Sequence, residues 1–288
     1  MNAGTKLGAY AVGLVLIFGA AAGAGKVIGP DAAPAPVAES HADMGGGAGG
    51  EDHVPGGLQI AEDGYRLQPL TTSLAVGAAR PFAFRVLGPD GAALTRYTPT
   101  HEKDLHLIVV RRDLTGFRHV HPTLGADGTW SVPLSVAERG QYRVFADFQP
   151  AGRADGLTLG ADVAAPGDYQ PRALAAPSRT ATVDDYRVTL DGDLVPGRSS
   201  TLTLTVEKDG VPVTDLQPYL GAYGHLVALR DGDLAYLHVH PEATPGAGPR
   251  ITFVAEVPSA GSYGLFLDFQ HGGKVRTVAF TATAGGVR

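Results

Sequence analysis

The sequence predicts an all-β protein built from two tandem β-sandwich domains. Three observations support this prediction: short apolar runs with alternating side chains, turn signals between those runs, and a repetition of the pattern in the second half of the chain. No stretch after residue 58 has the apolar spacing of a helix. The chain has 288 residues, which is enough for about two domains of ordinary size.

Residues 1–28 contain a hydrophobic segment for which the sequence predicts a helix. Residues 7–25 carry no charge and are flanked by Lys6 and Lys26. Their length matches the apolar thickness of a bilayer. Two interpretations remain open: a single-pass transmembrane anchor or a secretory signal peptide. Both give the same expected localisation, because the domains then lie outside the cell membrane or in a secreted protein.

Residues 29–57 are rich in glycine, proline and alanine, and we expect a disordered linker there. His41, Met44 and His53 lie in this stretch beside acidic residues. It is interpreted as a solvated tether or as a loose metal-gathering tail.

The two domains are predicted to come from an internal duplication. With an offset of 119 residues, the phrase His-Val-His-Pro at 119–122 falls on the same phrase at 238–241. A repeat of about 110 residues is far too long for a solenoid. We therefore expect one domain at 58–165, a joint at 166–177 and the second domain at 178–288.

A Gly-x-Tyr pattern in each half narrows the fold class. Tyr142 and Tyr263 stand in "RGQYRVFADF" and "AGSYGLFLDF", which resemble the tyrosine-corner strand of immunoglobulin-like sandwiches. In that strand the tyrosine hydroxyl bonds back to upstream backbone. The predicted fold class is thus two tandem Ig-like β-sandwich domains, preceded by the hydrophobic helix and the flexible linker.

The composition excludes several classes of function. The formal net charge is -6 and no basic stripe is visible, so nucleic acid is not an expected partner. There is no cysteine, which excludes disulfides, thiolate catalysis and thiolate metal ligands. The sequence also lacks the common hydrolase, phosphate-loop and zinc-protease motifs, so we expect no enzyme.

The repeated histidine phrase predicts a metal site in each domain. Alternate residues of a strand point to one face, so the two histidines of each phrase project side by side. A third histidine lies 13 residues upstream, across a hairpin turn; the Asp231-Gly232 turn would set His225 opposite His238. A register differing by two would keep the three rings on one face, whereas a slip by one would not. The expected ligands are His106, His119 and His121 in the first domain, and His225, His238 and His240 in the second.

Three imidazoles suit Cu(II), Zn(II) or Ni(II). Both methionines precede the domains, so thioether ligation of Cu(I) is not expected there. The alternative is structural: the histidines would bond loop carbonyls or pack inside the sandwich. Four further side chains are expected as a fourth ligand or an outer partner of a ligand, namely Asp147, Asp268, His271 and His101.

The strings "HLIVVRRDLTGFRHVHP" and "YLGAYGHLVALRDGDLAYLHVHP" resemble those of bacterial secreted or membrane-anchored tandem Ig-like proteins of the heavy-metal-binding type. The chain is also distantly similar to YtkA-like and CopC-like β-sandwiches of copper handling. This resemblance implies copper as the bound metal. The His-x-His phrase looks like the copper-ligand strand of Cu/Zn superoxide dismutase too, but the disulfide and further zinc ligands of that family are missing, which leaves dismutase activity as a minor alternative.

The expected function is extracytoplasmic binding, buffering or delivery of a divalent metal, with copper favoured over zinc or nickel. An extracytoplasmic metalloprotein or transporter is the expected protein partner. The alternative is a non-enzymatic Ig-like scaffold or adhesion module whose histidines are structural.

Overall fold

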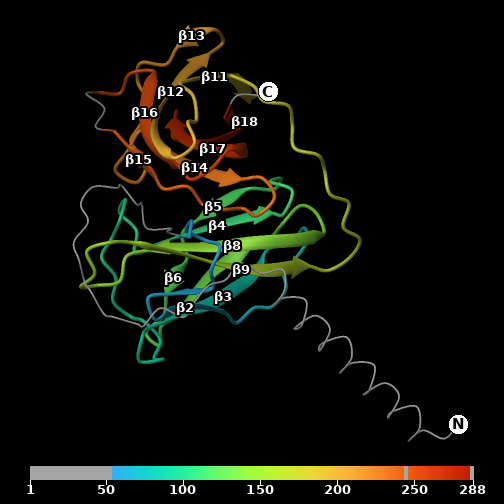
Figure 1. Cartoon of the computed structure of the whole chain (residues 1–288), viewed down its shortest axis with the longest axis vertical. Coiled ribbons are helices and arrows are strands. Elements are labelled where there is room, and N and C mark those ends of the chain that lie inside the picture. Colours follow the sequence, from blue (N-terminus) through green and yellow to red (C-terminus); the bar gives the residue numbers. More distant parts are fainter. Residues whose placement is uncertain (1–53, 243–245, 286–288) are drawn as a thin grey trace, which may run out of the picture. The chain divides into compact units, whose positions relative to one another are not determined.

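The computed structural model describes residues 54–242 and 246–285 (Figure 1). None of these residues belongs to a helix that is long and apolar enough to cross a membrane. The predicted hydrophobic helix and residues 29–53 of the predicted linker lie outside the described residues.

The first repeat folds as two antiparallel sheets that enclose a core. One sheet has the order β1-β2-β3-β7-β6 and the other the order β5-β4-β8-β9. Buried side chains of both sheets meet between them, among them Phe84, Trp130 and Phe148. The strands are β1 (Ala61–Glu62), β2 (Tyr65–Pro69), β3 (Arg80–Leu87), β4 (Leu105–Arg111), β5 (Arg118–Val120), β6 (Thr123–Leu124), β7 (Thr129–Leu134), β8 (Gly140–Phe148) and β9 (Leu157–Ala165).

The second repeat has the same two-sheet architecture with differences at the sheet edges. Its sheets have the orders β10-β11-β12-β16-β15 and β14-β17-β18, and β13 pairs with β12. The strand that carries the second His-Val-His-Pro phrase therefore belongs to the sheet opposite to that of its counterpart. The strands are β10 (Thr180–Val183), β11 (Tyr186–Asp191), β12 (Arg198–Lys208), β13 (Val211–Pro212), β14 (Gly224–Arg230), β15 (Val239–Pro241), β16 (Arg250–Val257), β17 (Gly261–His271) and β18 (Lys274–Ala284).

The prediction of tandem Ig-like sandwiches from a duplication is confirmed. The strand orders are those of the two sheets of an Ig sandwich. The tyrosine corner is present in both copies, since the hydroxyls of Tyr142 and Tyr263 donate to the carbonyls of Glu138 and Ser259, both at 2.7 Å. A period-two burial pattern accounts for strands such as β7, where Trp130 and its alternate neighbours face the core.

The central strands β4 and β14 are buried on both faces, which determines where the histidines lie. All seven residues of β4 are buried. Leu107 and Val109 point into the core of the first repeat, whereas Ile108 and Val110 point to a second apolar cluster shared with the second repeat. We call this second cluster the interface cluster; its buried members are Ile108, Val110, Leu114, Phe145, Val227, Leu229, Leu234 and Phe266.

The interface between the repeats has approximate two-fold symmetry. Phe117 stacks on Phe266 with a centroid distance of 4.1 Å and an interplanar angle of 3°. The equivalent residues in the other repeat, Tyr236 and Phe145, face each other at 5.5 Å. His106 and His225 lie on the same faces as the interface cluster, so the predicted histidine face is buried between the repeats.

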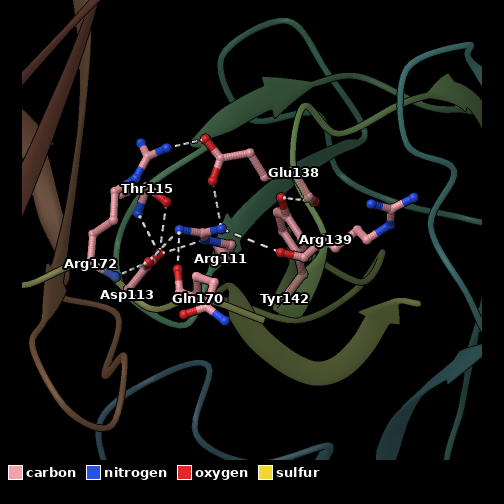
Figure 2. Close-up of polar contacts among 8 residues, drawn as sticks. All are labelled: Arg111, Asp113, Thr115, Glu138, Arg139, Tyr142, Gln170 and Arg172. Carbon is pink, nitrogen blue, oxygen red and sulfur yellow. Dashed lines mark hydrogen bonds and ion pairs between the residues drawn. The ribbon is translucent and has the colours of Figure 1, made fainter. Parts of the chain in front are cut away.

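The joint after the first repeat is fixed by a buried guanidinium, Arg111 (Figure 2). Two nitrogens of Arg111 donate to the two carboxylate oxygens of Asp113, at 2.9 and 2.6 Å. A third contact is made with Glu138 at 2.7 Å, and the carbonyl of Gln170 in the joint accepts from Arg111 at 3.3 Å. The amide of Arg172 donates to Asp113. The ion pair thus attaches the joint to the first repeat.

Residues 54–57, which we call the entry segment, lie between the two repeats. Gly56 pairs with Tyr236 of the second repeat, and the amide of Gly57 donates to Thr158 of the first at 2.7 Å. Arg143 donates to the carbonyl of Gly57 through two nitrogens at 2.9 and 2.6 Å. Only glycine fits at position 57, because φ is 73° and an added Cβ would lie 2.4 Å from the Phe145 ring.

Candidate metal centre

Three histidines of the first repeat converge on one point at the interface. The atom His106 Nδ1 lies 3.0 Å from His119 Nε2 and 3.1 Å from His121 Nε2. One ligand atom from each of the three residues lies within 4.8 Å of the others. The structure therefore brings together the three residues that the sequence singled out in the first domain.

The pairing of β4 with β5 explains this convergence. Ile108 lies opposite His119 and Leu107 opposite Val120, so His106 faces the position of His121. The register equivalent to the predicted one would set His106 opposite His119, and the observed register differs from it by two residues. A shift of two keeps all three rings on one face of the sheet.

Fixed hydrogen-bond partners determine which ring nitrogens carry protons. The carbonyl of Thr100 can only accept, so His106 Nε2, 3.0 Å away, donates, and His106 Nδ1 keeps a lone pair. The carboxylate of Asp268 lies 2.8 Å from His119 Nδ1, so this nitrogen donates, and the neutral tautomer of His119 has its lone pair on Nε2. His106 Nδ1 therefore lies within reach of both His119 Nε2, at 3.0 Å, and His121 Nε2, at 3.1 Å, and can accept a hydrogen bond from one of these nitrogens or bind a cation together with them.

Burial keeps the rings of His106, His121 and His225 neutral at neutral pH. Burial lowers the pKa of His106 to about 3, with a smaller contribution from the neighbouring rings, and it lowers the pKa of His121 to about 3. The pKa of His225 is lowered to about 4, again first by burial. Neutral imidazole is the form that binds metal ions, so these rings need no deprotonation at neutral pH.

The ring positions fit a single ion. With a metal–nitrogen bond of about 2.0–2.1 Å, a ring centroid lies about 3.2 Å from the ion, and two ligand rings at 90–110° lie about 4.5–5.2 Å apart. The observed centroid distances are 5.2 Å for His106–His119, 4.9 Å for His106–His121 and 4.8 Å for His119–His121. All three distances fall in the expected range, so the three residues fit a common divalent ion.

His225 and His101 lie beside this cluster. The ring of His225 is 6.1 Å from that of His119 and 6.5 Å from that of His106, which would require an angle above about 140° at a shared ion. Its Nε2 donates to the carbonyl of Tyr219 at 2.7 Å, just as His106 does to Thr100. His101 lies 5.1 Å from His225. Both rings therefore line the pocket above the cluster without completing its ligand set.

The predicted histidine triad of the second repeat is not assembled. The backbone of Leu237 still bonds to Ala228 of β14, but β15 then pairs with β16 in the opposite sheet. His238 and His240 consequently form no metal-ligand group with His225; both are exposed, with their rings 3.9 Å apart. Among the described residues, the group of His106, His119 and His121 is the one set of three side chains with metal-ligand geometry.

The three remaining predicted residues have different partners. Asp268 bonds His119 of the other repeat rather than a histidine of its own. Asp147 accepts from Thr158 at 3.2 Å, and burial raises the pKa of its carboxyl group. His271 lies between Tyr186, at 2.7 Å, and Asp215, at 3.0 Å, away from the cluster.

The sequence did not predict that Asp268 of the second repeat bonds to a histidine of the first repeat. One signal was available: the run "LHLIVV" is apolar at both parities, which is typical of a strand buried on both faces. Such a strand in a sandwich needs a partner outside its own domain.

The fold and the buried imidazole cluster define a tandem Ig-like protein with a histidine site at the junction of its repeats. The chain belongs to the family described as "Domain of unknown function (DUF8832)", whose model matches it twice, at residues 59–165 and 181–286. No curated protein matches the chain.

Several solved structures of multi-domain β proteins are similar to the chain. The Escherichia coli adhesin FdeC is 14% identical with a TM-score of 0.25; the match covers 78% of this chain and 65% of the adhesin, just under two thirds of its length. A titin Z1Z2 tandem is 16% identical with a TM-score of 0.18, over 76% of this chain and 97% of that one. Domains 4 and 5 of the S-layer protein SbsC are 12% identical with a TM-score of 0.22, over 79% and 100%. At these TM-scores the likeness carries no argument about function.

Proposed function

We propose that the chain is a non-enzymatic, extracytoplasmic tandem Ig-like protein that binds one divalent metal ion through His106, His119 and His121. The observation that carries this proposal is the convergence of the three rings, whose ligand atoms lie within 4.8 Å of one another, with His106 Nδ1 3.0 Å from His119 Nε2 and 3.1 Å from His121 Nε2. The ion would be captured, buffered or delivered to an extracytoplasmic metalloprotein or transporter, with no chemical step in the protein.

The choice of metal has a separate basis. Three imidazole nitrogens without sulfur suit Cu(II), Zn(II) and Ni(II) alike. Copper is favoured because the chain is distantly similar to YtkA-like and CopC-like β-sandwiches of copper handling. The extracytoplasmic location is proposed from the predicted hydrophobic segment at residues 1–28.

A second candidate is a scaffold or adhesion module in which the histidines only stabilise the interface. It is favoured by the burial of His106, which is 5% exposed, and by the absence of any unsatisfied buried side-chain nitrogen or oxygen among the described residues. In this case the cluster would only supply polar contacts that hold the two repeats together.

Calorimetric titration of the full chain with Cu(II) and Zn(II) tests the proposal. His121 is the best residue to replace, because it leaves the bond between His119 and Asp268 intact. Loss of a residue that only orients a ligand typically lowers metal affinity by roughly 10–100-fold. Because His121 is a proposed ligand itself, His121→Ala should lower the affinity of the tightest site by more than this. The matched control is His240→Ala, the equivalent substitution in the second repeat, which should leave this site unchanged.

Two results separate the candidates. If neither metal binds more tightly than to free histidine, the metal proposal is wrong and the interface role remains. If His121→Ala lowers the melting temperature of the metal-free protein while metal affinity stays the same, the histidine is structural.

A further inference from the structure

We infer that Asp268 is a positioning residue that acts across the repeat boundary, so that metal binding by the first repeat is linked to docking of the second. This inference rests on the proposed function. The three predicted ligands belong to the first repeat, but the carboxylate that orients one of them belongs to β17 of the second repeat.

Both oxygens of the Asp268 carboxylate are engaged. Oδ2 accepts from His119 Nδ1 at 2.8 Å, and Oδ1 accepts from the hydroxyl of Thr277 at 2.5 Å. Thr277 lies directly opposite Asp268 on β18, so the second repeat holds the carboxylate from its own sheet. The side chains of His119 and Asp268 are 5% and 6% exposed, which protects the contact from water. A carboxylate behind a ligand histidine fixes the tautomer of the ring and raises its basicity toward the metal.

The main aromatic contact of the interface lies beside the bond between His119 and Asp268. Phe117 and His119 lie two residues apart near β5, and Phe266 and Asp268 lie two residues apart on β17. The stack of Phe117 on Phe266 and the bond of His119 to Asp268 are therefore successive contacts of the segment 117–119 with β17. Separation of the repeats would break both contacts at once.

Asp147 supplies the matched comparison within the same chain. It is the equivalent of Asp268 in the first repeat: it lies opposite His106, as Asp268 lies opposite His225, and it accepts from Thr158, as Asp268 does from Thr277. Its equivalent histidine partner, His238, lies with β15 in the other sheet; it interacts electrostatically with Asp147, but no hydrogen bond joins the two side chains. The chain thus contains one carboxylate that is hydrogen-bonded to a predicted ligand, and one that lines the same pocket and interacts with His119 only electrostatically.

Linkage gives this arrangement a direct consequence. If docking of the second repeat strengthens metal binding by some factor, metal binding strengthens docking by the same factor. The bound ion would then act as a clamp that tightens the pair of repeats.

The experiment compares Zn(II) affinity of the full-length wild type with Asp268→Asn and Asp147→Asn. We expect Asp268→Asn to keep one site with affinity about 10–100-fold weaker, and Asp147→Asn, which removes no hydrogen bond to a ligand, to lose much less affinity. Equal affinity in all three proteins, or equal losses in both variants, would overturn the inference while leaving the metal site in place. A wild type that binds no Zn(II) or Cu(II) would instead overturn the proposed function.

Hydrogen exchange on the wild type gives a second test that needs no substitution. Zn(II) should slow amide exchange in β14 and β17 of the second repeat, which face the cluster, and leave β12 and β16 of the opposite sheet unchanged. Slowed exchange confined to the first repeat would contradict the linkage, even if Asp268→Asn proved unable to fold.

Discussion

Replacing Arg111 with methionine is expected to lower the free energy of unfolding by about 3–5 kcal/mol, because it leaves a buried carboxylate without its cation. The side chains of Arg111 and Asp113 are 2% and 4% exposed. Their bidentate contact is supported by Glu138 and by the joint carbonyl of Gln170. Methionine fills much of the same volume, so the loss of stability reflects the removed charge rather than a large cavity.

Denaturant unfolding of the metal-free protein checks this expectation. Trp130, the single tryptophan, lies in the core of the first repeat and reports its unfolding by fluorescence. Arg112→Met is the matched control, because Arg112 makes only a 3.7 Å contact with a half-exposed Asp162 and should cost less than about 1 kcal/mol. Similar small losses for both variants would show that the buried pair contributes little.

The pH dependence provides an independent check of the Arg111 result. Burial alone would raise the pKa of Asp113, but hydrogen bonds from Arg111, Arg172 and Thr115 hold it well below its usual 3.8. A carboxyl with a depressed pKa in the folded state contributes stability above its unfolded pKa, and this stability is lost as pH falls toward the folded value. The difference in the free energy of unfolding between wild type and Arg111→Met should therefore have its full size at pH 7 and be smaller below pH 3.8.

The second large effect is expected for Phe266→Ala, at about 3–5 kcal/mol. Phe266 is 5% exposed and stacks on Phe117 of the other repeat, so its removal leaves a cavity in the interface cluster rather than in either sandwich core. Calorimetric unfolding of the metal-free protein should show a lower transition and two separating components, one per repeat. Val211→Ala, at a side chain 65% exposed, is the control and should change little. A single unshifted transition in Phe266→Ala would contradict a stabilising interface.

The sequence predicted the sandwiches, the duplication and the tyrosine corners because each has a local signature. The prediction that His106, His119 and His121 share one face followed from the two-residue period of a strand. It stayed correct although the observed register differs from the predicted one by two residues. The sheet to which the second His-Val-His-Pro phrase belongs had no such local signature. In the first repeat Thr123 and Leu124 form a separate strand, β6, on the opposite sheet, which leaves β5 with β4.

In the second repeat one strand, β15, occupies the place of β6, so the same four letters end in a different sheet. The choice depends on which partner strand is free, which identical local sequences cannot encode. The contact of Asp268 with His119 was equally hidden, because it depends on how two domains dock and joins residues 149 positions apart.

The position of the entry segment between the repeats determines which contacts would carry a mechanical force applied from its N-terminal side. A pull applied at residue 54 reaches Gly56 and Gly57, which are bonded to Tyr236 of one repeat and to Thr158 and Arg143 of the other. Tension is therefore shared by both sandwiches at their common seam instead of peeling a single edge strand from one of them. A chain held by its N-terminal end would transmit force to the same seam that contains the three histidines.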